Sequence, residues 1–392
     1  MVTLIKNVNI VTLNGVIENG ALVFEGEKIT YVGKEKIETD RVIDGCGGYL
    51  LPGFVDVHCH GGGGFDFVDA TPDEILKIAD FHLSYGTTTL YATLPTTSID
   101  ELYSALENYR EFDKKYSNTT VAGLHLEGPW FNPAQCGAQD TSNMLTPNPN
   151  FLRELKNKYP FIKHVAAAPE LENGYEFGNT GKELGIVMSA GHTDASFSEI
   201  ERAFESGYTG MTHLYSGMKG VTRKNSFRIA GAVEGGLYID GMFVEIIADG
   251  RHLPYELLRF IFKFKGEDKI MLVTDATRAA GLPNGTESVV GSLANGTPII
   301  IEDEVAKLHD RQSFAGSIAT ADRLFRTMAE AIGKNWVALM KMSSYVPAHF
   351  MGLDDRGEIA VGKLADLVII DENCNLKKVI KGGIEADVRS TQ

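Results

Sequence analysis

The feature that most constrains the fold is a pattern that repeats eight times between residues 53 and 277. Short apolar segments recur there, and stretches with helical periodicity, such as the one starting at Thr71 and Pro72, lie between them. This alternation is typical of βα units around a parallel sheet, and eight units are the number that closes a (β/α)8 barrel. A doubly wound open sheet has the same local pattern, so the number of strands alone leaves both architectures open. The predicted strands lie in GFVDVHCH, GTTTLYATLPT, TVAGLHLEGPW, IKHVAAAPE, GIVMSAGHT, GMTHLYSG, MFVEIIADG and KIMLVTDAT.

The two chain ends have a different character. Short strand patterns with Gly and Asn between them fill the start of the chain, as in TLIKNVNIVTL and ALVFEGEKITYVG, and the end, as in GEIAVGKLADLVIID. The sequence therefore predicts an α/β protein, a TIM-like (β/α)8 barrel with a small β-sandwich built from both chain ends. The expected segments are 1–51 for the N-terminal part of the small domain, 52–350 for the barrel, and 351–392 for the C-terminal part.

Charge and cysteine usage exclude some classes of function. The net charge of −15 over 392 residues argues against a nucleic-acid surface. No apolar stretch has the length of a membrane helix, and the start of the chain lacks the pattern of a signal peptide. We expect a cytoplasmic protein with reduced thiols, because the cysteines have no CxxC spacing; they are Cys46, Cys59, Cys136 and Cys374.

Two histidines follow the first predicted barrel strand. His58 and His60 are two positions apart, so a strand would point both imidazoles to one face, and four glycines come next. Either the pair binds a metal, or it consists of two core histidines satisfied by hydrogen bonds. Further ionisable residues at the ends of later strands favour a metal, because in a barrel those ends converge on one mouth. The full set is His58, His60, Glu127 (with His125 on the same face), His192, His213 and Asp275.

A single histidine near a strand end is more often structural than a ligand. We place His82, on a predicted helix, and His164, at the entering end of the fourth strand, in that class. Glu127 is different, because burial of an acid inside an apolar strand is unfavourable without compensation. The combined pattern therefore indicates one or two divalent transition metals held by imidazole and carboxylate.

The motifs resemble those of a known family. LPGFVDVHCHG and GEIAVGKLADLVIID are similar to the metal-dependent amidohydrolase superfamily, and HLEGPW, SAGHTDA, MTHLYSGM, IADGRHLP, VTDAT and FAGS to its N-acetylglucosamine-6-phosphate deacetylases. The resemblance implies hydrolysis of the acetamide of an N-acetylhexosamine 6-phosphate, most simply N-acetylglucosamine 6-phosphate, to acetate and the amino sugar phosphate. It also implies a homodimer that acts on a small molecule, with no nucleic acid or membrane as partner.

The resemblance assigns roles to the ionisable residues. Glu127, His192 and His213 match the ligands of the main metal, and His58 and His60 match a pair that completes a second site in some members. One or two divalent ions per subunit are expected, zinc first, with iron, manganese or nickel as alternatives. The fourth strand has no lysine at its end, since Lys163 lies at its start, so Glu127 is the expected bridge. Asp275 matches the general base and then acid; the alternative is a ligand or a partner of one.

The substrate contacts implied by the resemblance are less regular. An arginine from the loop after the sixth strand reaches the phosphate of the neighbouring subunit in the family, although a basic loop is often only a solvated face. Here Ser216 and Gly217 replace Asn-Ala, Gln139 stands where a histidine is common, Asn225 aligns with the expected arginine, and Thr277 replaces a methionine. The expected substrate-binding residues are Ala138, Gln139, Ser216, Gly217, Arg223, Arg228, His252 and Phe314.

These departures leave the substrate open. The hydrolytic residues match the family while the sugar-phosphate contacts differ, so the galactosamine epimer or another N-acyl substrate is an alternative. A cyclic-amide or N-acyl-amino-acid hydrolase would keep the chemistry, but the missing lysine on the fourth strand argues against the cyclic-amide branch. A catalytically silent barrel used for binding is disfavoured, because all five ligand positions and Asp275 are retained.

Overall fold

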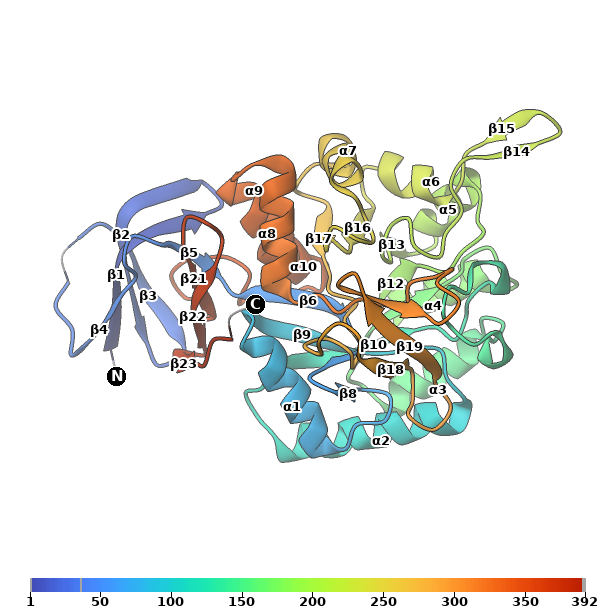
Figure 1. Cartoon of the computed structure of the whole chain (residues 1–392), viewed down its shortest axis with the longest axis horizontal. Helices are drawn as coiled ribbons and strands as arrows, with labels where there is room; N and C mark the ends of the chain where they lie inside the picture. Colours follow the sequence, from blue (N-terminus) through green and yellow to red (C-terminus); the bar gives the residue numbers. More distant parts are fainter. Residues whose placement is uncertain (1, 36, 390–392) are drawn as a thin grey trace.

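The computed structural model describes residues 2–35 and 37–389 and contains a nearly closed barrel of eight parallel strands (Figure 1). Their order in the sheet is β17-β16-β13-β12-β11-β10-β9-β6, with every neighbouring pair parallel. Seven of the eight predicted segments contain one of these strands, and the sixth, residues 210–217, overlaps β13 only at Gly210 and Met211; the arrangement confirms the barrel over the open sheet. The strands are β6 (Phe54–Cys59), β9 (Thr87–Leu94), β10 (Val121–Glu127), β11 (Ile162–Ala167), β12 (Val187–Ala190), β13 (Tyr208–Met211), β16 (Phe243–Ile246) and β17 (Ile270–Leu272).

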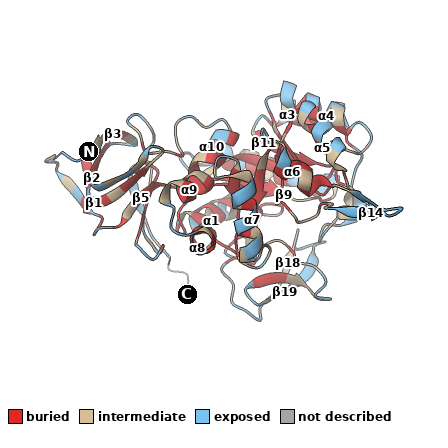
Figure 2. Ribbon diagram, turned by 90° about the horizontal axis from the view of Figure 1, so that it is seen from above, coloured by how far each residue is buried: buried red, intermediate tan, exposed pale blue. Residues whose placement is uncertain are grey.

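Helices surround the barrel and cover its strands. Helix α1 begins as predicted, after Thr71 and with Pro72 as its first residue, and Glu74 accepts hydrogen bonds from the Thr71 backbone and hydroxyl at 2.9 and 2.8 Å. The strands are almost entirely buried beneath these helices (Figure 2). The helices are α1 (Pro72–Leu83), α2 (Ile99–Lys115), α3 (Pro149–Lys158), α4 (Gly174–Glu183), α5 (Phe197–Glu205), α6 (Ala232–Tyr238), α7 (Tyr255–Lys265), α8 (Ala321–Ile332), α9 (Trp336–Met340) and α10 (Val346–Phe350).

The two chain ends form one small β-domain, as predicted. Strand β5 from the first end pairs antiparallel with β21 from the second, with Leu50 opposite Ile369, and both side chains are buried in that domain's own core. Helix α10 ends at Phe350 and β21 begins at Leu367, so the C-terminal strands fall inside the predicted segment 351–392. The sheet contains β1 (Val2–Thr12), β2 (Gly15–Glu25), β3 (Lys28–Gly33), β4 (Arg41–Asp44), β5 (Tyr49–Pro52), β21 (Leu367–Ile370), β22 (Leu376–Lys381) and β23 (Ile384–Ala386).

The first and last barrel strands meet through residues beyond their ends. The backbone N–H of Asp275 donates to the carbonyl of His58 at 2.9 Å, and that of His60 donates to the carbonyl of Ala276 at 2.8 Å. Strand β17 stops at Leu272, so the segment that closes the ring is the one that carries Asp275. Closure of the barrel thereby fixes Asp275 beside the histidine pair.

Three small β-structures were not predicted from the sequence. The chain turns after His60 into β7 (Gly61–Gly62) and β8 (Phe65–Asp66). The hairpin of β14 (Thr222–Lys224) and β15 (Phe227–Ile229) projects from the barrel and is exposed (Figure 2). Between β17 and α8, β18 (Glu287–Val290), β19 (Thr297–Glu302) and β20 (Val305–Leu308) form an antiparallel sheet. Among the described residues, no helix is both long and apolar enough to cross a membrane.

Candidate metal centre and substrate cavity

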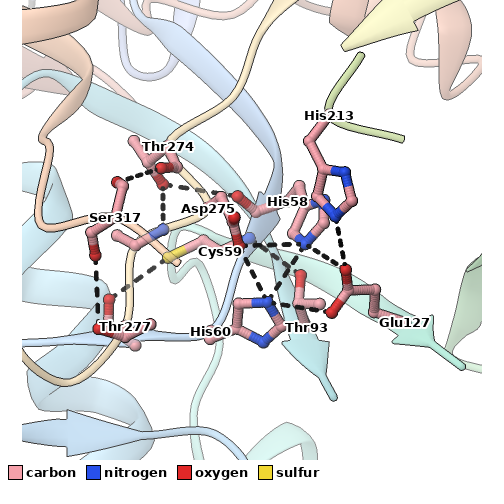
Figure 3. Close-up of polar contacts among 12 residues, drawn as sticks. His58, Cys59, His60, Thr93, Glu127, His213, Thr274, Asp275, Thr277 and Ser317 are labelled. Atoms are coloured by element: carbon pink, nitrogen blue, oxygen red, sulfur yellow. Dashed lines mark hydrogen bonds and ion pairs between the residues drawn. The ribbon is translucent and has the colours of Figure 1, made fainter. Parts of the chain in front are cut away.

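Glu127 contacts all four histidines of the predicted cluster, three of which, His58, His60 and His213, are labelled beside it in Figure 3. It is the last residue of β10, and its Oε1 lies 2.9 Å from Nε2 of His213 and 3.1 Å from Nε2 of His192. On the other side, His58 Nε2 is 3.7 Å from Oε1 and His60 Nε2 is 3.4 Å from Oε2. The carboxylate thus belongs to two buried groups that could each hold an ion, Glu127 with His192 and His213, and Glu127 with His58 and His60.

Three residues of the cluster lie just past their strands, in turns with an unusual backbone. The φ angles are 44° at His192, 30° at His213 and 47° at Asp275, values that non-glycine residues rarely adopt. We predicted that the sixth strand contains His213, but β13 ends at Met211 and the chain turns before the histidine. Such conformations persist where the surrounding structure enforces them, and they concentrate at functional sites.

Hydrogen-bond partners at Nδ1 determine the tautomers of three imidazoles of the cluster. Nδ1 of His58 faces Glu245 Oε2 at 3.0 Å, Nδ1 of His192 faces the carbonyl of Gln135 at 2.8 Å, and Nδ1 of His213 faces the carbonyl of Ser216 at 3.2 Å. These partners only accept hydrogen bonds, so each Nδ1 carries the proton. In the neutral rings, the Nε2 lone pairs then converge on the Glu127 carboxylate.

This donor set fits a cation. Lone pairs of imidazole and carboxylate at about 3 Å repel one another unless a positive charge lies between them. Among the described residues, neither Glu127 nor Asp275 forms an ion pair with a lysine or arginine. Burial lowers the pKa of His213, but the hydrogen bond and charge of Glu127 outweigh burial and raise this pKa to about 9. The cluster therefore favours positive charge at its centre.

Asp275 joins the cluster from the side of the histidine pair. Its Oδ1 lies 3.1 Å from His60 Nε2 and 3.5 Å from His58 Nε2. Burial raises the pKa of Asp275, but the nearby His58 and His60 outweigh it and hold this pKa below its usual value. The side chain is therefore a carboxylate, able to accept a proton, and it lines the cavity described next.

A cavity of about 280 Å³ opens above the cluster. Its lining includes His60, Glu127, His192, His213 and Asp275, together with six of the eight predicted substrate-binding residues. Those six are Ala138, Gln139, Ser216, Gly217, His252 and Phe314. Parts of the β18–β19 sheet and the segment before α8 complete the wall, so residues from outside the eight strands enclose the cluster.

The other two predicted contacts lie elsewhere. Arg223 is on β14 and Arg228 is on β15, both exposed on the projecting hairpin, and neither lines the cavity. Among the described residues, the cavity lining contains no lysine or arginine. The described lining of this cavity therefore offers a phosphate no lysine or arginine side chain.

Gln139 and His252 face the cavity in defined orientations. Nε2 of Gln139 donates to Glu127 Oε2 at 2.7 Å, and its Oε1 accepts from the backbone of Thr96 at 3.0 Å. Nδ1 of His252 donates to Asp249 at 2.8 Å, and its ring packs on Phe314 at 4.9 Å. The amide thus touches the proposed bridge directly, although it carries no charge.

The histidines predicted to be structural pack around the cluster. His82 Nε2 donates to the carbonyl of Gly61 at 2.9 Å, and His164 Nε2 lies 2.7 Å from the Ser189 hydroxyl. The ring of His125 stacks on His164 at 3.9 Å and meets the edge of His58 at 4.8 Å. These residues support the cluster without entering either ion-binding group.

The sequence analysis missed two buried acids near the cluster. Glu245 on β16 is fully buried behind His58, and Asp66 on β8 lines the cavity with its Oδ2 unpartnered among the described residues. Burial raises the pKa of Asp66 to about 6. The signal for Glu245 was available, because it interrupts an apolar strand as Glu127 does; Asp66 follows a glycine run and has no such signal.

The fold and the site together define a class of protein, the barrel hydrolases that bring histidines and acids from several strand ends to one mouth. The family model described as Amidohydrolase family matches residues 49–385. An N-acetylglucosamine-6-phosphate deacetylase of Lysinibacillus sphaericus is 32% identical over 97% of this chain and 96% of its own length. An N-acetylgalactosamine-6-phosphate deacetylase of Escherichia coli O157:H7 is 28% identical over 84% and 85%.

Solved structures agree with these relatives. N-acetylglucosamine-6-phosphate deacetylase from Thermotoga maritima superimposes with a TM-score of 0.87 at 31% identity, over 98% of this chain and 100% of that one. A mutant of the Mycobacterium smegmatis enzyme in complex with N-acetyl-D-glucosamine-6-phosphate has a TM-score of 0.88 at 27% identity, over 99% of each chain. The chain belongs to the amidohydrolase family and, within it, to the N-acetylglucosamine-6-phosphate deacetylases.

Proposed function

We propose that the protein hydrolyses the acetamide of N-acetylglucosamine 6-phosphate to glucosamine 6-phosphate and acetate. The observation that carries this proposal is the convergence of five candidate ligand side chains and Asp275 in one cluster, of which all but His58 line the cavity. Acetamide hydrolysis needs a polarised carbonyl, an activated water, and a group that moves a proton. The relatives that are similar over almost the whole chain bear the name of this activity.

Glu127, His192 and His213 would hold one divalent cation, and His58 and His60 would hold a second with Glu127 as the bridge. A divalent cation bound there supplies a Lewis acid for the carbonyl and lowers the pKa of water. Zinc is the first expectation, because imidazole and carboxylate are ligands that suit it, with iron, manganese and nickel as alternatives.

Asp275 would transfer the proton. Its carboxylate lies at the cavity floor, beside His60, and is ionised, so it can take a proton from the attacking water. The same side chain would then return this proton to the departing amine. Gln139 would orient the acetamide through its donor group, and His252, which also lines the cavity, would contact the sugar.

The phosphate would be bound with help from a second subunit. The cavity lining contains no lysine or arginine among the described residues, whereas Arg223 and Arg228 project on an exposed hairpin. In a homodimer, this hairpin would bring a guanidinium to the partner's cavity. Mixing Asp275→Asn protein with Arg228→Ala protein tests this, because exchange of subunits would restore one complete site and recover activity; no recovery after verified exchange would contradict it.

The protein would work in the cytoplasm. Its four cysteines are all free, as expected in a reducing compartment, and the proposed substrate is a phosphorylated sugar, a class of metabolite found inside cells. The function is tested by acetate release from N-acetylglucosamine and N-acetylgalactosamine, each with and without a 6-phosphate. Preference for phosphorylated N-acetylglucosamine supports the proposal. Preference for the galactosamine epimer would support the alternative, which the relative from Escherichia coli O157:H7 and the altered residues Ser216 and Gly217 favour.

A further inference from the structure

Glu245 is a buried carboxylate that the proposed reaction does not use. It lies on β16, is fully buried and does not line the cavity, so it cannot touch a substrate. Its Oε2 is 3.0 Å from Nδ1 of His58 and 3.3 Å from the backbone nitrogen of His213. Its Oε1 has no hydrogen-bond partner among the described residues. An acid in such a place needs an explanation, because its burial is unfavourable without compensation.

The contact with His58 fixes the state of that ring. A carboxylate only accepts hydrogen bonds, so Nδ1 of His58 must carry the hydrogen and Nε2 must present a lone pair. The opposite tautomer would set two lone pairs 3.0 Å apart in a buried place. The Nε2 lone pair faces His60 Nε2 at 3.2 Å and Glu127 Oε1 at 3.7 Å, inside one of the two ion-binding groups.

The charge of Glu245 also favours a cation at this position. Among the residues that the structure describes, Glu245 forms no ion pair with a lysine or arginine. Together with Glu127 and Asp275 it places three carboxylates around His58. In a low-dielectric interior, neutral imidazoles do not balance these charges, whereas divalent cations do.

The same oxygen links the two groups. Because Oε2 accepts from both the His58 ring and the His213 backbone, it holds a residue of β6 and the turn after β13 at a fixed separation. We propose that Glu245 is a positioning residue that keeps His58 in its metal-binding tautomer and so makes His58, His60 and Glu127 a second cation site. This inference rests on the metal-dependent hydrolysis proposed above and deepens it.

The test is zinc binding to two variants. Glu245→Gln removes the charge but keeps an oxygen that can accept from His58 Nδ1, whereas Glu245→Met is similar in size and removes both the charge and the acceptor. Asp366→Asn is the matched control, because Asp366 is equally buried but pairs with Lys381 at 2.8 Å in the small domain. Competition with a chelator and elemental analysis measure the number of ions and both affinities. We expect two ions per chain in the wild type and in Asp366→Asn, and a second ion bound about 10–100-fold more weakly in Glu245→Met, with a smaller loss in Glu245→Gln, which keeps the acceptor. The first ion should remain within a few-fold of wild type, because His192 and His213 keep their own Nδ1 acceptors.

A single ion in the wild type, or unchanged affinity for both ions in both Glu245→Gln and Glu245→Met, would overturn the inference. If the variants do not fold, ¹⁵N histidine spectra of zinc-loaded wild-type protein decide: the inference requires His58 protonated at Nδ1, and protonation at Nε2 refutes it. Failure of the proposed function looks different. Two tightly bound ions, the second weakened by Glu245→Met, without acetate release from any sugar would leave this inference standing and remove the function.

Discussion

Two buried histidines beside the metal cluster should make the protein sensitive to mild acid. Burial lowers the pKa of His82 and of His164 from the ordinary value of 6.5 to about 4. Each ring is therefore neutral in the folded protein at pH values where the unfolded chain already binds a proton. The stability that depends on a neutral ring is complete above pH 6.5 and is lost as the pH falls toward 4.

The size of the effect follows from the pKa difference. A lowering from 6.5 to 4 corresponds to about 3 kcal/mol per histidine at low pH, and to about 2 kcal/mol at pH 5. Unfolding entropies near 2.1 cal/mol/K per residue imply roughly 0.8 kcal/mol/K for a chain of this length, so about 2 kcal/mol lowers Tm by about 2–3 °C. Protonation of these rings would also disturb the metal cluster. His82 donates a hydrogen bond to the carbonyl of Gly61, next to His60, and His164 stacks on His125, which packs against His58.

Thermal melts from pH 8 to pH 5 of wild type, His82→Gln and His164→Gln measure this loss. Excess chelator keeps all samples free of metal, so the ligand histidines contribute equally to each. The fall in Tm should be smaller by about 2–3 °C in each variant, because glutamine does not titrate. Exposed His309→Gln is the control and should follow the wild type. Equal falls in Tm for wild type and His82→Gln would refute the reasoning for that residue.

Four further outcomes follow from the site. Asp275→Asn should lower kcat by about 10²–10⁴-fold with bound metal largely unchanged, as elemental analysis and acetate release would show; normal turnover would exclude Asp275 as the proton carrier. Glu127→Gln should reduce metal content at both groups, since one carboxylate serves them both; retention of two ions would refute the bridge. Arg223→Ala and Arg228→Ala should raise KM for 6-phosphorylated sugars alone, and equal effects on unphosphorylated ones would contradict a phosphate role. Gln139→Leu should lower kcat/KM about tenfold through loss of one hydrogen bond, and steady-state kinetics at wild-type levels would show that the amide is dispensable.

The barrel and the clustering of the candidate metal ligands could be predicted because their signals are local. An apolar strand that ends in a histidine or an acid can be recognised from a few consecutive residues. The strand ends of a barrel converge regardless of the conformation of the loops. The sixth strand was placed wrongly at its end, because residues 210–217 contain several strand-forming side chains while the chain turns at His213 with a φ of 30°. That turn depends on the surrounding packing, including the bond from the His213 N–H to Glu245.

The β18–β20 sheet could not be predicted in the same way. Its buried residues Ile299, Ile301 and Ala306 pack on Ala279 and Ala315, which come from segments before and after the sheet. Their alternation is short, and burial depends on partners that the local sequence does not identify. Likewise, the local sequence does not predict the hairpin that carries Arg223 and Arg228; only the family resemblance, which implies contact with a neighbouring subunit, pointed away from the cavity of their own chain.

The segment between β18 and β19, residues 291–296, lines the cavity and forms what we call its roof. It is hydrogen-bonded to the barrel at points that do not involve the metal cluster. Glu101 at the start of α2 accepts hydrogen bonds from Ser292 at 2.6 Å and Asn295 at 2.9 Å, and Asp69 accepts from the backbone of Leu293 at 2.7 Å. These three bonded residues lie between β18 and β19, whereas the ion-binding side chains sit at or just past barrel strands. Changes in the roof, in the loop of Gln139 or in the hairpin can therefore alter which sugar fits without moving the hydrolytic centre. This separation would allow the sugar-phosphate contacts to differ from those of the family, as the sequence resemblance implies, while the proposed hydrolytic residues stay in place, and we expect the choice between sugar epimers to depend on the loops.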